Sequence, residues 1–472
     1  MTLFKFVMGQ SKAAAQGTGI ALGSYHSIGL LSKSGGESPE YAMYAFGRGF
    51  HGQLGQGVHL GRNTPHRIDE VDRDCLPVSL YTGKPGDINL AVVNAGSSHT
   101  TAISRRGELF TWGLASSGEL GHGGWTPIEV SVPRMVSNLG RTRIVSVCAG
   151  DNHTLAISES GQLWACGRGR HGQLGHGHFH DEGMMTLISS IHRERIVSVS
   201  AGRAHSIALA ADGKLFTWGD ASHGQLGHNQ LETLVGDNRQ PIAIPFPQAI
   251  TSLDPTKLQP PERVTAIAAG GNHSMAVTVG GSLLAFGSNC SGQLGLGDTE
   301  NRFMPTRVAL LAKGGAAVRA VQVQCGAAHS IMLAQRLGRM EVKTTGDNSY
   351  GQLGHGDLVA SQKFVTIDAL TSKKIMCVSS GDFHVAAIDE SGKLYTWGRG
   401  DCGQLGHGDD KSRWVPRLLE DFSVVHPDRT LRRNRKKVPK PLILSGSEIE
   451  KMPEVGRGPN NPYRPSWSAS MF

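Results

Sequence analysis

Seven histidines recur at regular intervals along the chain, and histidine is the side chain most often used as a metal ligand or as a general base near neutral pH. Each of them ends a Gly-x-x-His motif. They are His26, His99, His153, His205, His273, His329 and His384. If each repeat forms its own β-sheet, neighbouring histidines lie about 10 Å apart, whereas zinc–nitrogen bonds measure about 2 Å. We therefore expect each histidine to hydrogen-bond within its own repeat or to the next one, as a structural contact.

A second histidine cluster comprises His176, His178 and His180, followed by Asp181 and Glu182. Alternation along a strand would place three imidazoles on one face, which is a pattern that metal sites use. Because the segment follows a Gly-Gln-Leu-Gly motif, we expect a loop there and predict no metal site. The sequence also lacks a nucleophile elbow and paired acid–base motifs, and its glycine-rich segments do not open a helix after a parallel strand. We predict no catalytic residue and no cofactor.

These histidines belong to a repeat that occurs seven times. Gly-x-x-His is followed by an alternating run, a tight turn and a second run, and then by Gly-Gln-Leu-Gly, which reads Gly-Glu-Leu-Gly once. In the fourth repeat the turn is Ala211-Asp212-Gly213-Lys214, and Asp-Gly between two β-prone runs is a hairpin signal. Another β-prone run precedes each Gly-x-x-His. A unit of about fifty residues with four antiparallel strands is typical of one propeller blade.

The motif series resembles the repeat of the regulator of chromosome condensation family, from about residue 18 to residue 420. The resemblance implies an all-β fold, a seven-bladed β-propeller of four-stranded antiparallel blades, for residues 1–425. The seventh repeat ends near Leu419 without a further strand motif. We therefore expect a strand at Gly19–Leu22 to pair with residues Val415–Val425 and to close the ring.

Two connections between repeats, Gly55–Gly96 and Gly227–Gly270, are longer than the others. The first contains the mixed-charge segment 67–74, and the second contains six prolines, which favour an extended chain. Long loops on a rigid scaffold are frequent binding sites. We expect these two insertions to contact partners.

Residues 426–472 differ in composition from the rest of the chain. They hold ten Lys and Arg against four Asp and Glu, and so carry +6 of the chain's net +8. Seven prolines predict an extended segment. The predicted partner-binding residues of this tail are Arg429, Arg432, Arg433, Arg435, Lys436, Lys437, Lys440, Tyr463 and Trp467. The basic run fits a nuclear-import receptor, DNA, RNA, or an acidic protein surface such as a microtubule or chromatin; its alternative is a solvated tail without a partner. The two aromatic residues favour a protein partner.

The composition indicates an intracellular protein. The seven cysteines include no Cys-x-x-Cys pair, as expected for reduced core residues. No apolar run approaches the roughly 18 residues of a membrane span. We predict no membrane association and a cytoplasmic, cytoskeletal, ciliary or nuclear location.

The resemblance implies several functions, because one fold serves many. Founding members of the family exchange guanine nucleotide on the small GTPase Ran, with a wedge that interrupts the glutamine motif of an early blade. Here all seven motifs are intact. Plant UV-B photoreceptor relatives carry Trp-Arg before the repeated histidine, and this chain has no tryptophan there. We expect a non-enzymatic protein-interaction scaffold in a larger multi-subunit assembly; the alternative is a guanine-nucleotide exchange factor for a Ran-type GTPase.

Overall fold

The computed structural model describes residues 19–33, 41–69, 90–123, 129–229, 243–256, 262–310 and 318–424. The chain divides into two units, Met1–Pro427 and Asp428–Phe472, and every described residue lies in the first. The predicted tail residues, from Arg429 to Trp467, and the middle parts of both long insertions lie outside the described residues. The division into a propeller of residues 1–425 and a tail of 426–472 stays a prediction.

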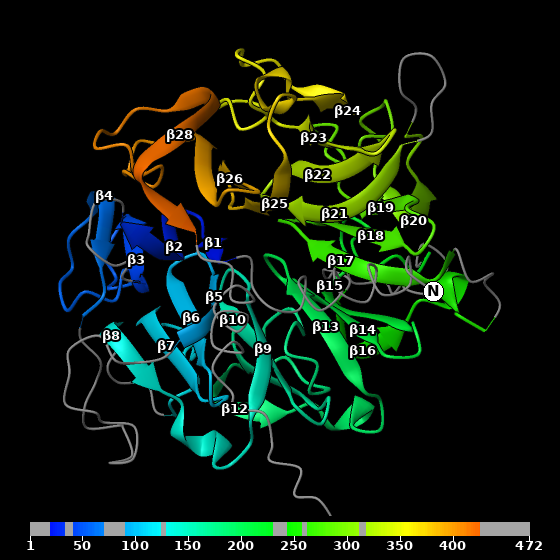
Figure 1. The fold of residues 1–472 in the computed structure, drawn as a ribbon. Coiled ribbons are helices and arrows are strands. Elements are labelled where there is room, and N and C mark those ends of the chain that lie inside the picture. The colour runs from blue at the N-terminus through cyan, green and yellow to red at the C-terminus, as the bar shows by residue number, and fades with distance from the viewer. Residues whose placement is uncertain are drawn as a thin grey trace, which may run out of the picture. The chain divides into compact units, whose positions relative to one another are not determined.

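Seven blades of four antiparallel strands each are arranged in a ring (Figure 1), five of them as separate sheets and blades 1 and 7 joined in one sheet. This arrangement confirms the predicted propeller. Blade 1 holds β1 (Ile20–Leu22), β2 (His26–Lys33), β3 (Tyr41–Gly47) and β4 (Arg62–Arg67). Blade 2 holds β5 (Leu90–Ala95), β6 (His99–Ser104), β7 (Leu109–Leu114) and β8 (Glu129–Met135). Blade 3 holds β9 (Ile144–Ala149), β10 (His153–Ser158), β11 (Leu163–Gly167) and β12 (Glu182–Leu187). Blade 4 holds β13 (Ile196–Ala201), β14 (His205–Ala210), β15 (Leu215–Asp220) and β16 (Ala243–Ala249).

Blade 5 holds β17 (Val264–Ala269), β18 (His273–Thr278), β19 (Leu283–Gly287) and β20 (Arg302–Arg307). Blade 6 holds β21 (Arg319–Cys325), β22 (His329–Arg336), β23 (Arg339–Gly346) and β24 (Ser361–Thr366). Blade 7 holds β25 (Ile375–Ser380), β26 (His384–Asp389), β27 (Lys393–Gly398) and β28 (Arg413–Val424). Among the described residues, short 3-10 helices at Ser137–Leu139, Ser189–Ile191, Thr251–Leu253 and Asp368–Leu370 connect one blade to the next.

The path of the strands gives the ring two different faces. In every blade the first strand ends at the Gly-x-x-His turn, the second runs away from it, and the third returns and leads into the Gly-Gln-Leu-Gly loop. Both repeated motifs therefore lie on one face, which we call the loop face. The hairpin turns between the second and third strands lie on the opposite face, which we call the hairpin face.

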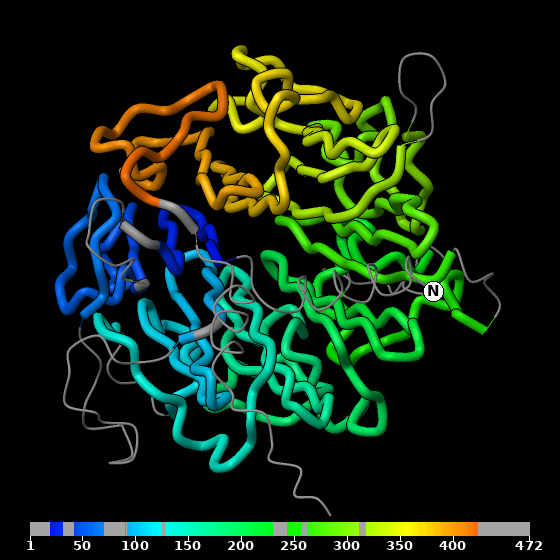
Figure 2. Tube along the Cα trace, viewed as in Figure 1, coloured from blue at the N-terminus to red at the C-terminus, as the bar shows by residue number. Residues whose placement is uncertain are grey.

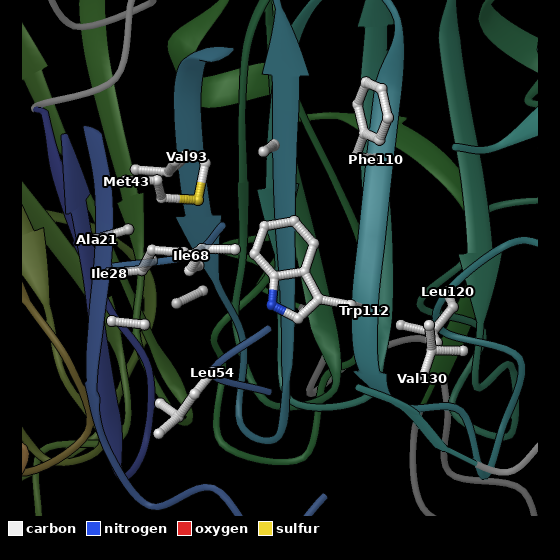
Figure 3. Packing of buried hydrophobic residues seen from close by; sticks show 13 residues of the cluster. Ala21, Ile28, Met43, Leu54, Ile68, Val93, Phe110, Trp112, Leu120 and Val130 are labelled. Atoms are coloured by element: carbon white, nitrogen blue, oxygen red, sulfur yellow. The ribbon is translucent and has the colours of Figure 1, made fainter. Parts of the chain in front are cut away.

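The hydrophobic core lies between neighbouring blades, because a single sheet cannot cover both of its own faces. Between blades 1 and 2, the fully buried Trp112 packs among Ile28, Leu54 and Val93 (Figure 3). The Trp112 indole Nε1 donates to the backbone carbonyl of Gln53, at 3.0 Å, in the Gly-Gln-Leu-Gly loop of the preceding blade. The repeated loop thus docks on the next blade rather than on its own.

An N-terminal strand closes the ring, as predicted, but it does so through other residues than the predicted ones. Residues Ile20–Leu22 pair with Ser27–Gly29 inside blade 1 and not with Val415–Val425, so that prediction is wrong. Instead, the end of β28 pairs with β2, Val424 opposite Leu31, and joins blades 7 and 1 in one eight-stranded sheet. Figures 1 and 2 show these blades side by side, blade 1 in blue and blade 7 in orange. The reason is the phase of the repeat: each blade begins with the strand before Gly-x-x-His, so blade 7 already has four strands.

Candidate partner-binding surface

The seven repeated histidines form hydrogen bonds from one blade to the next around the ring, with 2.9–3.0 Å between the imidazole Nε2 and a serine or threonine hydroxyl. Six of the bonds reach the residue that directly follows the next repeated histidine. They join His26 to Thr100, His99 to Thr154, His153 to Ser206, His205 to Ser274, His273 to Ser330, and His384 to Ser27. The last of these bonds joins blade 7 to blade 1. We call these seven contacts the latches.

Blade 7 contains the one exception to this pattern. Val385 stands where the other blades carry a hydroxyl. His329 instead bonds to Ser380 Oγ, at 2.9 Å, on the neighbouring strand β25. The latch is therefore kept although the repeated residue is lost.

The surroundings of the latches fix their protonation state. Each of the six repeat hydroxyls donates to the carbonyl of the glutamine or glutamate in a Gly-Gln-Leu-Gly-type loop, as Ser206 does to Gln173 at 2.8 Å. The imidazole Nε2 must therefore be the donor, and Nδ1 is buried with no hydrogen-bond partner among the described residues. Burial lowers the pKa of His153 to about 3 and that of His205 to about 4. The latch histidines are therefore neutral, and their hydrogen bonds connect one blade to the next.

The glycine of each Gly-x-x-His motif is required by close packing. A Cβ on Gly23 would collide with the ring of His26 and with the backbone carbonyl of Gly96, the next glycine around the ring. The same relation links all seven glycines, and Gly381 faces the carbonyl of Gly23. The glycines let seven turns meet around the central axis.

The other histidine cluster lies on the loop after the Gly-Gln-Leu-Gly motif of blade 3. The ring centroids of His176 and His178 are 5.8 Å apart, and those of His178 and His180 are 5.3 Å apart. His178 Nε2 lies 3.4 Å from Glu182 Oε1. Within the described part of the chain, no group of three or more His, Cys, Asp or Glu is arranged to hold a metal ion.

A cluster of arginines and aromatic residues lies on the loop face where blades 6, 7 and 1 meet. Its centre is Arg399, whose guanidinium carbon lies 4.6 Å from the ring centroid of Tyr350, 5.0 Å from that of Tyr25 and 5.6 Å from that of Phe383. Tyr350 and Phe383 pack edge to face, at 5.4 Å. Arg48 lies 5.4 Å from the Tyr25 ring and 5.2 Å from the Phe50 ring. We call these six residues the Arg–aromatic cluster.

The two arginines of the cluster differ in their electrostatic surroundings. Arg399 is held by both carboxylate oxygens of Asp401, at 2.6–2.9 Å, and the pKa of Asp401 is accordingly lowered although partial burial opposes this. Arg48 has no carboxylate within ion-pair distance among the described residues, and its Nε is buried without a hydrogen-bond partner there. Within that part of the chain, one arginine is thus neutralised and the other is an uncompensated cation.

A second set of charges lies beside the axis, on the same face. Arg203 Nε lies 3.3 Å from Asp151 Oδ2, and Ser24 Oγ donates to Asp382 Oδ2 at 2.5 Å. Burial, together with the nearby Asp382 carboxylate, raises the pKa of Asp151 to about 7. Burial also raises the pKa of Asp382. The centre of the loop face therefore carries two carboxyl groups whose pKa values are both raised, that of Asp151 to about 7.

The sequence reasoning singled out the repeated histidines but missed the Arg–aromatic cluster. A signal exists: Tyr25 and Phe383 directly precede the repeated histidine, in blades 1 and 7, and Arg48 and Arg399 directly follow the glycine that ends the third strand of the same blades. Arg168 stands at the same position in blade 3, so the arginines alone do not single out a site. Only the adjacency of blades 1, 6 and 7 brings these residues together in one surface.

This geometry defines a seven-bladed propeller of the regulator of chromosome condensation type. Residues 42–434 match the model of the RCC1-like domain, and the chain belongs to that family. It is 30% identical over 406 residues to the ultraviolet-B receptor UVR8 of Arabidopsis thaliana, covering 86% of this chain and 82% of that protein. It is 33% identical over 360 residues to the E3 ubiquitin-protein ligase HERC2 of Homo sapiens, covering 75% of this chain but only 7% of the ligase.

Solved structures agree with this assignment at the level of the fold. Prp20p from Saccharomyces cerevisiae superposes with a TM-score of 0.66 at 20% identity, over 90% of this chain and 97% of that chain. Prp20p is described as binding Gsp1p and histones. Among the described residues, no helix is both long and apolar enough to span a membrane. Membership of this family supports a protein-interaction or regulatory role.

Proposed function

We propose that this chain is a non-enzymatic protein-interaction scaffold whose loop face binds a protein partner within a larger assembly. The observation that carries the proposal is the Arg–aromatic cluster. Arginine and aromatic residues are enriched at the centres of protein–protein interfaces, where they supply most of the binding energy. Here six of them converge from three blades, and Phe50 is 60% exposed.

Rigidity supports the same function. The latches and the β2–β28 pairing fix the blades that carry the cluster, so that little conformational freedom is lost when a partner binds. Loops on a rigid framework are the usual place for binding residues. The tail, with its basic run from Arg429 to Lys440 and its aromatic residues Tyr463 and Trp467, would act as a second arm toward an acidic protein surface.

The relatives support protein binding as the mode of action, because the structurally similar Prp20p is described as binding Gsp1p and histones. Guanine-nucleotide exchange is the alternative that the family membership keeps open. The seven Gly-Gln-Leu-Gly-type loops all lie in the described part of the chain, and none of them carries an insertion. For that reason we place the scaffold first, and a cytoskeletal, ciliary or chromatin-associated assembly remains our expectation for its setting.

The test is affinity purification from cells with three versions of the full chain. Wild type is compared with Tyr350→Ala/Phe383→Ala, which disrupts the cluster, and with a control on the hairpin face, Leu337→Ala, where an 82% exposed side chain is removed. Each interactor is then purified and its affinity measured. We expect at least one partner to be lost with the double variant and kept with the control. Equal recovery from all three versions would contradict the proposal. Deletion of residues 426–472 measures how much the tail contributes to the affinity for each partner.

A further inference from the structure

We infer that the Arg48–Phe50 side of the cluster is a docking site for an acidic segment of the protein partner that also presents an apolar side chain. This inference rests on the proposed function and names the chemistry of the partner. It concerns the loop of blade 1 between β3 and β4, which carries Arg48, Phe50 and Leu60.

Arg48 supplies the charge. It is held over the rings of Tyr25 and Phe50, and it has no carboxylate partner among the described residues. Its Nε is buried and donates to nothing in that part of the chain. A guanidinium presents five N–H donors in a fixed fork that matches a carboxylate. Because its neighbour Arg399 is already satisfied by Asp401, Arg48 is the position that an incoming carboxylate would complete.

Phe50 and Leu60 supply the apolar contact. Their side chains are 60% and 57% exposed, although they are held in place by their own loop. A Cβ on Gly49 would collide with the carbonyl of Leu60, so the two ends of the loop are in close contact. His59 Nδ1 lies 3.1 Å from the carbonyl of Phe50. The exposed rings and methyl groups are therefore presented on a fixed base.

Blade 2 anchors this loop through one carboxylate. Glu129 at the start of β8 lies 2.7 Å from Nδ1 of His51 and 3.3 Å from Nδ1 of His59. The only nearby carboxylate of blade 2 in the described part of the chain is thus engaged by two imidazoles. Arg48, which has no carboxylate partner among the described residues, lies in the same loop as two exposed apolar side chains. That combination fits a peptide with Asp or Glu flanking an apolar residue.

A nucleic acid fits this surface less well. The loop face also carries the carboxylate of Asp401, which holds Arg399, and the carboxyl group of Asp382, which directly precedes Phe383. A continuous polyanion would meet these charges as well as Arg48, whereas a single carboxylate on a peptide can avoid them. Nucleic acid and phosphorylated peptides are outcomes that the test separates.

The experiment selects random dodecapeptides displayed on phage against the immobilised full chain. We expect enrichment of Asp or Glu next to Leu, Ile, Phe or Trp. A fluorescent copy of the strongest peptide then reports affinity by anisotropy. Arg48→Glu and Phe50→Ala should each weaken binding about tenfold or more, and Arg48→Lys less, because an ammonium lacks the bidentate geometry. Arg48→Glu should also gain selectivity for peptides with Lys or Arg.

Matched controls lie on the hairpin face: Arg105→Glu removes an exposed arginine from the turn between β6 and β7, and Leu337→Ala removes an exposed apolar side chain. Both should bind like wild type, and all variants should keep the wild-type melting temperature. Enrichment of non-acidic or only phosphorylated ligands, competition by DNA or RNA, no enrichment at all, or equal binding by Arg48→Glu would each overturn the inference. The proposed function would survive any of these results if Tyr350→Ala/Phe383→Ala still lost its partner.

Discussion

The ring of latches and the Arg–aromatic cluster differ in burial, in charge and in the number of blades that contribute to them. Every blade contributes one latch histidine, which is buried, neutral and bonded to the next blade. Only blades 1, 6 and 7 contribute to the cluster, which is charged and partly exposed. In this molecule the positions that are the same in every blade hold the ring together, and positions that vary between blades form the cluster that we propose as a partner-binding surface.

Acidic pH should destabilise the latches in all seven blades. The folded pKa values of the latch histidines are lowered by burial to about 3–4. The unfolded chain therefore binds more protons below a pH of about 6.5, and stability falls as the pH decreases. At about pH 5 we expect a loss of roughly 1–2 kcal/mol per latch.

The raised pKa of Asp151, about 7, acts in the opposite direction between about pH 7 and 4. Burial raises the pKa of Asp382 and Glu119 as well, so these groups oppose the seven histidines without matching them. Urea unfolding at a series of pH values measures the balance. A free energy of unfolding that is unchanged at about pH 5 would show that the histidines are not the acid-sensitive groups.

A single latch should have a smaller but still large effect. His153→Ala leaves a cavity and removes the donor to Ser206 Oγ, which still donates to Gln173. We expect a loss of about 2–4 kcal/mol in the free energy of unfolding. The control is His171→Ala, on a loop of the same blade. Circular dichroism during urea unfolding compares the two variants. Equal midpoints would mean that the latch contributes nothing measurable.

The exceptional latch of blade 7 offers a sharper test. Ser380→Ala removes the hydroxyl that accepts from His329, which should cost about 1–3 kcal/mol because the buried donor loses its partner. Val385→Ser, added to that variant, restores a hydroxyl at the repeat position and should recover part of the loss. Thermal unfolding of the wild type, both single variants and the double variant gives the coupling. Strictly additive effects would contradict an exchange of one acceptor for the other.

The buried glutamate that replaces glutamine in the loop of blade 2 should lower the stability of the fold. Glu119 replaces the repeated glutamine, is almost fully buried, and accepts from the Ser117 N–H at 2.7 Å. Burial raises its pKa, so the carboxylate costs stability at neutral pH. Glu119→Gln keeps the acceptor and removes the charge, and we expect about 1 kcal/mol of stabilisation, decreasing toward acidic pH. A destabilised variant would instead indicate that the carboxylate is needed by Arg168.

The smallest expected effect is that of this chain on guanine-nucleotide exchange. With seven uninterrupted Gly-Gln-Leu-Gly-type loops, we expect no appreciable acceleration of fluorescent-nucleotide release from a Ran-type GTPase. An authentic exchange factor serves as the positive control. Strong acceleration at catalytic amounts of this chain would move the exchange function to first place and would give the loop face a specific partner.

The blades could be predicted from the sequence because the motifs that define each blade lie close together along the chain. A Gly-x-x-His motif, an Asp-Gly turn such as Asp212-Gly213, and Gly-Gln-Leu-Gly lie within one unit of about fifty residues. The ring is closed by an N-terminal strand, as predicted, but the predicted pairing of Gly19–Leu22 was wrong because the phase of a repeat is ambiguous. Counted from the histidine, the last repeat lacks a strand, whereas counted from the strand before the histidine, no repeat does. The pairing of Ile20 with Gly29 settles the phase.

The cluster could not be predicted in the same way. Tyr25 and Arg399 lie near opposite ends of the propeller sequence and meet only because the ring closes. For the latches, a hydrogen bond to the neighbouring repeat was one of the predicted possibilities. The hydroxyl that follows the next histidine was not recognised as the acceptor. The tail residues, including Arg432 and Trp467, lie outside the described residues, and their role stays a prediction.

The pairing of β28 with β2 also has a consequence for synthesis on the ribosome. Leu31 emerges early, but its partner Val424 is made almost at the end of the propeller sequence. At about 5–20 residues per second, this edge of blade 1 waits for tens of seconds with unpaired backbone groups. During that interval the nascent chain exposes a strand edge and the apolar flank of Leu31 that blade 7 later covers. The order of translation thus leaves one edge of the first blade uncovered until the last blade has been made, and a chaperone that shields strand edges would have its target there.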